Sequence, residues 1–129
     1  MILGVGMDMT EIDRIQELLN KPTVEQFLQR VLTPAERVLA EKRKARLAEY
    51  VAGRFAAKEA VAKALGTGIG AVVGFQDIEI VHDDRGKPAC LLHQDALVRA
   101  GLEPTVRFHL SITHTDHTAA AFVVVERLL

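Results

Sequence analysis

The segment from Arg54 to Lys63 combines cations with one carboxylate on a background of small residues. Glu59 and Lys63 are four positions apart, as are Arg54 and Lys58, so on a helix each pair lies on one face. Mg²⁺ takes one or two protein carboxylates and completes its octahedral shell with water and phosphate oxygens. The spacing alone suits ordinary surface ion pairs. The background of small residues leaves open a second interpretation, a magnesium–phosphate site.

A further carboxylate, Asp8, follows the pattern Gly4-Val5-Gly6 near the start of the sequence. A dinucleotide-binding fingerprint needs a third glycine, which does not follow here. The two glycines instead favour a strand against which another element packs closely. Asp8 stands at the end of this apolar strand, just before a predicted helix start. Two interpretations remain open for it: a helix cap or a ligand for a hard metal ion.

His114 and the basic residues 42–46 are further candidates for phosphate binding. His114 follows a predicted strand, so its side chain reaches the rim of a sheet and either stays solvated or donates to a phosphate. Residues 42–46 form either part of a solvated helix face or a local basic patch. The sequence contains no zinc-binding motif, because Cys90 has no cysteine partner and the histidines are not spaced as zinc ligands are. Neither a nucleophile elbow nor a Walker loop is found.

Hydrophobic periodicity predicts the elements that carry these residues. Apolar residues at helical spacing predict a long helix over residues 48–65, stopped by glycine, and a short one over 94–100. Threonines followed three positions later by an acidic or amide residue predict helix starts at Thr10, Thr23 and Thr33. Because strands and helices do not alternate regularly, we expect an α+β fold with a mainly antiparallel sheet. Strands are predicted over residues 2–9, 78–82, 89–92, 106–113 and 118–126, with a hairpin turn at 83–88.

The composition is that of a globular protein without a strong global charge. The chain has 129 residues, 49% hydrophobic and 26% charged, so we expect one domain over residues 1–129. A formal net charge of −1 excludes a global field that would draw the protein to nucleic acid or to anionic membranes. The single cysteine excludes an internal disulfide, and the first residues lack the features of a signal peptide. We therefore expect a cytoplasmic protein.

In their order and in their residues, these motifs together resemble those of the holo-acyl-carrier-protein synthase family of 4′-phosphopantetheinyl transferases. Residues 4–15 resemble its N-terminal signature, and residues 54–68 resemble its second signature, which is highly specific. The resemblance covers nearly the whole chain. Met9 stands where a branched aliphatic residue is commoner and Thr113 where serine is frequent, but neither departure removes a charged group. Three shorter motifs complete the set: Gln76-Asp77-Ile78-Glu79-Ile80, Gly86-Lys87-Pro88 and Ser111-Ile112-Thr113-His114.

The resemblance implies a magnesium-dependent enzyme of fatty acid biosynthesis. It would move the 4′-phosphopantetheine group of coenzyme A to a serine of an apo-acyl carrier protein and release 3′,5′-ADP. Asp8 and Glu59 would hold Mg²⁺ together with the pyrophosphate of coenzyme A. Glu59, directly or through a metal-bound water, would take the proton of the serine. Lys63 would neutralise charge on the phosphates as the bond breaks.

The same resemblance implies binding roles and an assembly. Arg14 would meet the acidic helix of the carrier protein. The larger transferases look like two fused copies of this unit, so one copy would complete its active site between subunits, as a homotrimer. Asp8 and Glu59 would then face each other across a protomer boundary or near it. The residues expected to contact coenzyme A are Arg54, Lys63, Gly66, Pro88 and His114.

Overall fold

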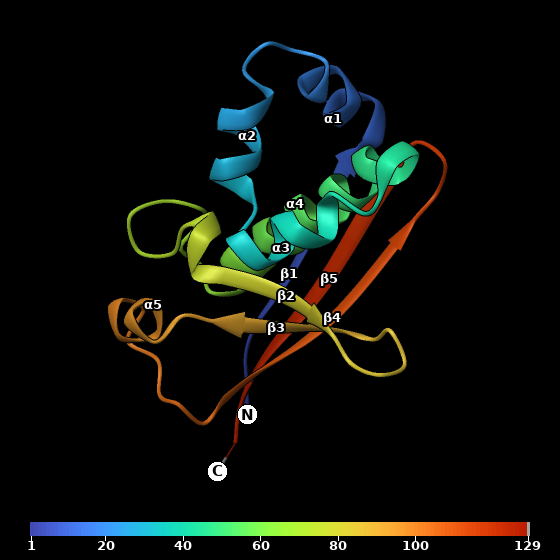
Figure 1. Ribbon diagram of the computed structural model, residues 1–129. Coiled ribbons are helices and arrows are strands. Elements are labelled where there is room, and N and C mark those ends of the chain that lie inside the picture. The colour runs from blue at the N-terminus through green and yellow to red at the C-terminus, as the bar shows by residue number, and fades with distance from the viewer. Residues whose placement is uncertain (129) are drawn as a thin grey trace.

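The computed structural model describes residues 1–128 and has the expected α+β architecture (Figure 1). A long helix, α4, packs on one face of a three-stranded antiparallel sheet in the order β1-β5-β4. A two-stranded antiparallel sheet, β2-β3, packs beside α4 and β4. The strands are β1 Ile2–Glu11, β2 Ile78–His82, β3 Pro88–Leu92, β4 Val106–His114 and β5 Thr118–Arg127. The helices are α1 Ile12–Leu19, α2 Val24–Val31, α3 Pro34–Ala40, α4 Leu47–Ala64 and α5 Gln94–Arg99, with 3₁₀ turns η1 Lys44–Arg46 and η2 Phe75–Asp77.

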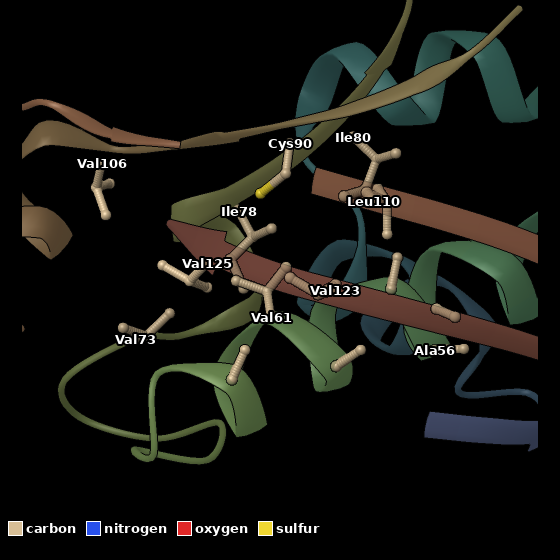
Figure 2. Close-up of a cluster of buried hydrophobic side chains, with 14 residues drawn as sticks. Ala56, Val61, Val73, Ile78, Ile80, Cys90, Val106, Leu110, Val123 and Val125 are labelled. Atoms are coloured by element: carbon tan, nitrogen blue, oxygen red, sulfur yellow. The ribbon is translucent and has the colours of Figure 1, made fainter. Parts of the chain in front are cut away.

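Helix α4 is the centre of the molecule, because it is buried on both sides. One apolar cluster lies between α4, the three-stranded sheet and the β2-β3 hairpin, and Figure 2 shows its valine, isoleucine and alanine side chains. A second cluster packs α1, α2 and α3 against the other side of α4. A helix that is apolar on all sides is a buried helix. The alanine-rich sequence of α4 therefore fits its place between two layers.

Strand β1 lies very close to α4, and its two glycines make this approach possible. A Cβ atom on Gly4 would lie 1.8 Å from the carbonyl oxygen of Ala64, and one on Gly6 would lie 2.0 Å from that of Ala60. Because side chains alternate between the faces of a strand, Gly4, Gly6 and Asp8 all face α4. The expectation that another element packs closely on this strand is confirmed.

The opposite face of β1 and β5 is apolar and exposed. Val5, Met7 and Met9 are 54%, 58% and 66% exposed, and Phe122 on β5, which pairs with Met7, is 45% exposed. Large apolar patches of this kind mark interaction surfaces. None of the helices in residues 1–128 is long and apolar enough to cross a membrane.

Most predicted elements are confirmed, and the helix starts show the main differences. Thr33 accepts from the backbone N–H of Glu36 in a complete capping box, as predicted. Thr23 stands at the N-cap of α2 but makes no capping hydrogen bond. Thr10 does not cap a helix, because β1 continues to Glu11. The charged segment after Thr33 is not one solvated helix either: α3 ends at Ala40, and Glu36 is buried.

Candidate functional site

Strand β1 and helix α4 bring Asp8 and Lys63 together. Nζ of Lys63 donates to Oδ1 of Asp8 at 2.8 Å, and the hydroxyl of Thr10 donates to Oδ2 at 3.1 Å. The Asp8 side chain is 15% exposed, whereas that of Lys63 is 51% exposed. Asp8 lies inside β1 and caps no helix, so the capping interpretation is wrong. Pairing with Asp8 raises the pKa of Lys63, which keeps its ammonium charged.

Glu59 lines the same pocket as Asp8. This pocket has a volume of about 760 Å³ and lies between β1, α1, α2, α4 and η2. Burial raises the pKa of Glu59 above its ordinary value, and the nearby charge of Asp8 raises it further. Lys63 and Arg30 act in the opposite direction. Glu59 is therefore a better proton acceptor than a solvated glutamate, which suits a general base. A surface pair between Glu59 and Lys63 is not formed, because Lys63 pairs with Asp8.

The donors around Asp8 and Glu59 fit Mg²⁺. Two carboxylates and the Thr10 hydroxyl are hard oxygen ligands of the kind that Mg²⁺ prefers. No group of three or more histidine, cysteine, aspartate or glutamate side chains suited to a metal occurs within residues 1–128. Mg²⁺ usually takes only one or two protein carboxylates and keeps its other positions for water and phosphate. Asp8 already binds one cation, the Lys63 ammonium, at this position.

The walls of the Asp8–Glu59 pocket combine cations with apolar side chains. Arg14 comes from α1 and Arg30 from the last turn of α2, while Phe27 and Phe75 are among the apolar lining residues. Such a surface suits an acidic protein partner better than a small apolar ligand. Arg14 was predicted to lie in the site, but Arg30 was not. The sequence places Arg30 on a short amphipathic helix, and only the packing of α2 against η2 brings it to the pocket.

A second, smaller pocket of about 160 Å³ brings Arg54 and His114 together. Arg54 is 5% exposed, its guanidinium stacks 4.3 Å from the centre of the Tyr50 ring, and its Nε has no hydrogen-bond partner. Nε2 of His114 lies 2.7 Å from Oε1 of Glu49. The cations and imidazoles that line this pocket are Arg43, Arg46, Arg54, His82 and His114.

This cluster suits an anion. A buried N–H without a partner is costly unless a ligand satisfies it. Burial lowers the pKa of His82, and the nearby charges of Arg54 and Arg43 lower it further. The predicted basic patch is only partly formed, because Arg43 and Arg46 line the pocket whereas Lys42 and Lys44 do not.

Three further residues of the family motifs, Gly66, Pro88 and Lys58, lie elsewhere. Gly66 follows α4 with a φ of 76°, a left-handed conformation that favours glycine at a helix end, and open space surrounds it. Pro88 lines a third pocket with Lys87 and Ser111, of about 360 Å³. Lys58 is fully buried and pairs with Glu36, so it is neither a surface residue nor available to a phosphate.

The two charged pockets lie on different sides of α4. Glu59 and Arg54 are five positions apart, which is about 140° around a helix. The structure therefore keeps the Asp8–Glu59 pocket and the Arg54–His114 pocket separate within one chain. Asp8 and Glu59 line one pocket of the same chain, so no protomer boundary needs to run between them, and their position near such a boundary stays a prediction.

Comparisons with known proteins agree on one family. The family model of the 4′-phosphopantetheinyl transferase superfamily matches residues 4–122. The holo-[acyl-carrier-protein] synthase of Geobacillus kaustophilus is 50% identical, over 99% of this chain and 92% of that protein. The crystal structure of the synthase from Bacillus anthracis in complex with CoA (3′,5′-ADP) has a TM-score of 0.83 and 45% identity, with 99% of both chains covered. The synthase structure from Neisseria meningitidis has a TM-score of 0.87 and 39% identity, covering 98% of this chain and 100% of that one.

Proposed function

The chain belongs to the 4′-phosphopantetheinyl transferase superfamily, and we propose that it is a holo-acyl-carrier-protein synthase. It transfers the 4′-phosphopantetheine group of coenzyme A to a serine of an apo-acyl carrier protein and releases 3′,5′-ADP. The observation that carries this proposal is that Asp8 from β1 and Glu59 from α4 line one pocket, while Lys63 from α4 pairs with Asp8. Simple nucleotide binding does not need a carboxylate with a raised pKa beside a phosphate.

The chemistry is a substitution at the β-phosphorus of coenzyme A. The serine oxygen of the carrier protein attacks this phosphorus, the bond to the bridging oxygen breaks, and 3′,5′-ADP leaves with the electron pair. Glu59 accepts the serine proton. Lys63 moves from Asp8 to the phosphate oxygens as charge develops on them. Asp8 and Glu59 would hold Mg²⁺, which supplies Lewis-acid polarisation of the phosphate oxygens.

Coenzyme A would also use the Arg54–His114 pocket for one of its phosphates. The unpartnered Nε of Arg54 and the surrounding arginines support this assignment. Because that pocket and the Asp8–Glu59 pocket lie on different sides of α4, we propose that they meet between neighbouring subunits. A contact between two different surfaces of the same chain forms a ring when the rotation from one subunit to the next closes on itself. The exposed apolar face of β1 and β5 supplies a surface for it, and the ring that we propose is a homotrimer.

The transfer reaction is tested by mass spectrometry of an apo-acyl carrier protein incubated with coenzyme A and this protein, with and without Mg²⁺. We expect the serine to gain one phosphopantetheine group and 3′,5′-ADP to appear, only when Mg²⁺ is present. Binding of coenzyme A without release of 3′,5′-ADP would instead identify a non-catalytic binding module. No binding of coenzyme A would point to a structural oligomer. Carrier proteins of fatty acid and polyketide pathways, compared by kcat/KM, would identify the partner.

The shared active site predicts complementation between inactive variants. Glu59→Gln and Arg54→Gln each remove one half of every site, so each alone should be inactive. In a ring trimer of randomly mixed subunits, about a quarter of the sites combine an intact Glu59 with an intact Arg54. Unfolding and refolding the two variants together should therefore restore about a quarter of the wild-type activity. No restored activity in mixed trimers would contradict a shared site.

The trimer itself is tested by light scattering. The wild type should have three times the 14.2 kDa mass of the chain. Phe122→Glu should give monomers with lost transferase activity, because it places a charge in the centre of the apolar face. Val98→Glu is the control, since Val98 is 71% exposed on α5 and lies outside that face. An active monomer would contradict the proposed assembly.

If Arg14 contacts the carrier protein as proposed, binding of the carrier protein should depend on salt. Arg14→Gln should raise the KM for the carrier protein about fivefold at low salt, since an exposed charge pair contributes on the order of 1 kcal/mol. The difference should shrink as ionic strength rises, because salt screens exposed charges. Arg85→Gln is the matched control, as Arg85 lies in the exposed turn between β2 and β3. Equal salt dependence of KM in the two variants would show that Arg14 does not contact the carrier protein.

A further inference from the structure

A fully buried ion pair lies behind the Asp8–Glu59 pocket. Nζ of Lys58 donates to Oε1 of Glu36 at 2.6 Å, and the two side chains are 0% and 1% exposed. Lys58 is adjacent to Glu59 in the sequence, but the pair takes no part in the proposed chemistry. Burying two charges costs several kcal/mol of desolvation per ion, which their attraction offsets only when the geometry is good and further hydrogen bonds satisfy both groups. Burial accordingly lowers the pKa of Lys58, against the influence of Glu36.

The ammonium of Lys58 connects four segments of the chain. Besides its bond to Glu36, it donates to the carbonyl oxygen of Val31 at 2.7 Å and to that of Phe75 at 3.1 Å. An ammonium has three donors, and here all three are used. Lys58 therefore fixes the end of α2, the first turn of α3 and the turn η2 at defined positions on α4.

Glu36 extends this network to the hairpin. Its Oε1 accepts from the backbone N–H of Thr33 at 2.8 Å, and its Oε2 accepts from that of Ile80 at 2.9 Å. The hydroxyl of Tyr50 donates to the backbone carbonyl of Glu36 at 3.1 Å. Tyr50 is also the residue on which Arg54 stacks. The pair is thus fully hydrogen-bonded, which a buried pair needs to be stable.

Two of the segments that Lys58 connects, α2 and η2, are walls of the Asp8–Glu59 pocket. Arg30 immediately precedes Val31, and both Arg30 and Phe75 line the pocket. The Arg30 guanidinium lies 5.7 Å from the centre of the Phe75 ring, so the two walls contact each other. Nε2 of Gln76 adds a second connection, because it donates to the carbonyl oxygens of Gln29 and Leu32, each at 2.7 Å.

We infer that Lys58 is a positioning residue, which holds the α2 and η2 walls of the pocket in the geometry that receives the carrier protein. A pair of apolar side chains could fill the same space with equal or greater stability, but it could not direct three hydrogen bonds to α2, α3 and η2. The inference rests on the proposed function, because it assigns these walls to the carrier protein.

The test compares Lys58→Met with Val125→Ala at a temperature where both are folded. Val125 is buried in the cluster between α4 and the sheet, which contains no residue of α2 or η2, so it controls for lost stability. Lys58→Met should raise the KM for the carrier protein about tenfold, because small displacements of binding groups are costly. Its KM for coenzyme A should stay within about twofold, since the Arg54 pocket lies on another side of α4. Val125→Ala should change neither KM.

A lower kcat with both KM values unchanged would show that Lys58 only maintains the folded fraction, and would overturn the inference. If Lys58→Met does not fold, Gln76→Leu takes its place in the test. Gln76 is exposed and, like Lys58, connects the α2 and η2 walls. Gln76→Leu should raise the carrier KM by a smaller factor, and an unchanged value would also overturn the inference. Amide hydrogen exchange should be faster in residues 24–32 and 74–77 of Lys58→Met than in Val125→Ala. A wild type without transferase activity would refute the proposed function instead, whatever the exchange rates.

Discussion

Glu59→Gln is expected to lower kcat/KM for phosphopantetheine transfer by a factor of about 10²–10⁴, the usual contribution of a general base. Glutamine has the shape of glutamate but cannot accept the serine proton, and it is a weaker ligand for a hard cation. The rate is measured by mass spectrometry of the carrier protein at saturating Mg²⁺. Glu103→Gln, on the loop between α5 and β4, is the control and should keep the wild-type rate. If Glu59→Gln keeps the wild-type rate, Glu59 takes no part in the reaction.

The same substitution should not destabilise the protein. The pKa of Glu59 is raised in the folded state, first by burial and then by Asp8, so the folded protein favours the neutral form. The stabilising contribution of this group is present below the unfolded pKa and is lost as the pH rises through the folded pKa. At pH 7 the ionised carboxylate therefore costs stability, and glutamine removes that cost. We expect a Tm at pH 7 equal to or above that of the wild type, which separates lost catalysis from lost folding.

Local signals in the sequence predicted the elements well, because they depend on neighbouring residues. The capping box at Thr33, the hairpin after Ile78 and the alternation from Val106 all formed as expected. Thr10 has the same local pattern as Thr33, but β1 pairs with β5 as far as Glu11, so strand pairing prevents a cap there. A competition between two elements for one segment is not visible in a short motif.

The chemistry of α4 was harder to predict, because four charged residues on one helix have three different environments. Lys63 is half exposed and pairs with Asp8, Glu59 faces the pocket, and Lys58 and Arg54 are buried. Their spacing alone suggested surface pairs. The alanine and glycine background on every side of the helix was the better signal, because it indicates a helix buried between two layers. A lysine inside such a helix needs a buried acceptor, which α3 supplies 22 residues earlier in the chain.

Gly6→Ala is expected to destabilise the protein by about 2 kcal/mol or more, as overpacking of a rigid contact does. The new Cβ would lie 2.0 Å from the carbonyl oxygen of Ala60 and 2.7 Å from the backbone nitrogen of Ala64. Both are backbone atoms of α4, so no side chain can move aside, and β1 must shift away from the helix. Thermal unfolding measures the loss of stability, which should appear as a lower Tm.

The shift should also reduce transferase activity beyond the loss of folded protein. Asp8 lies two residues after Gly6 on the same face of β1, so it moves with the strand, away from Lys63 and Glu59. Displacements of about 1 Å can cost 10²-fold in rate. Gly70→Ala is the matched control, because its Cβ would meet no atom within 4 Å and its φ is outside the left-handed region. If Gly6→Ala keeps the wild-type rate per folded molecule, the distance between β1 and α4 does not set the geometry of the active site.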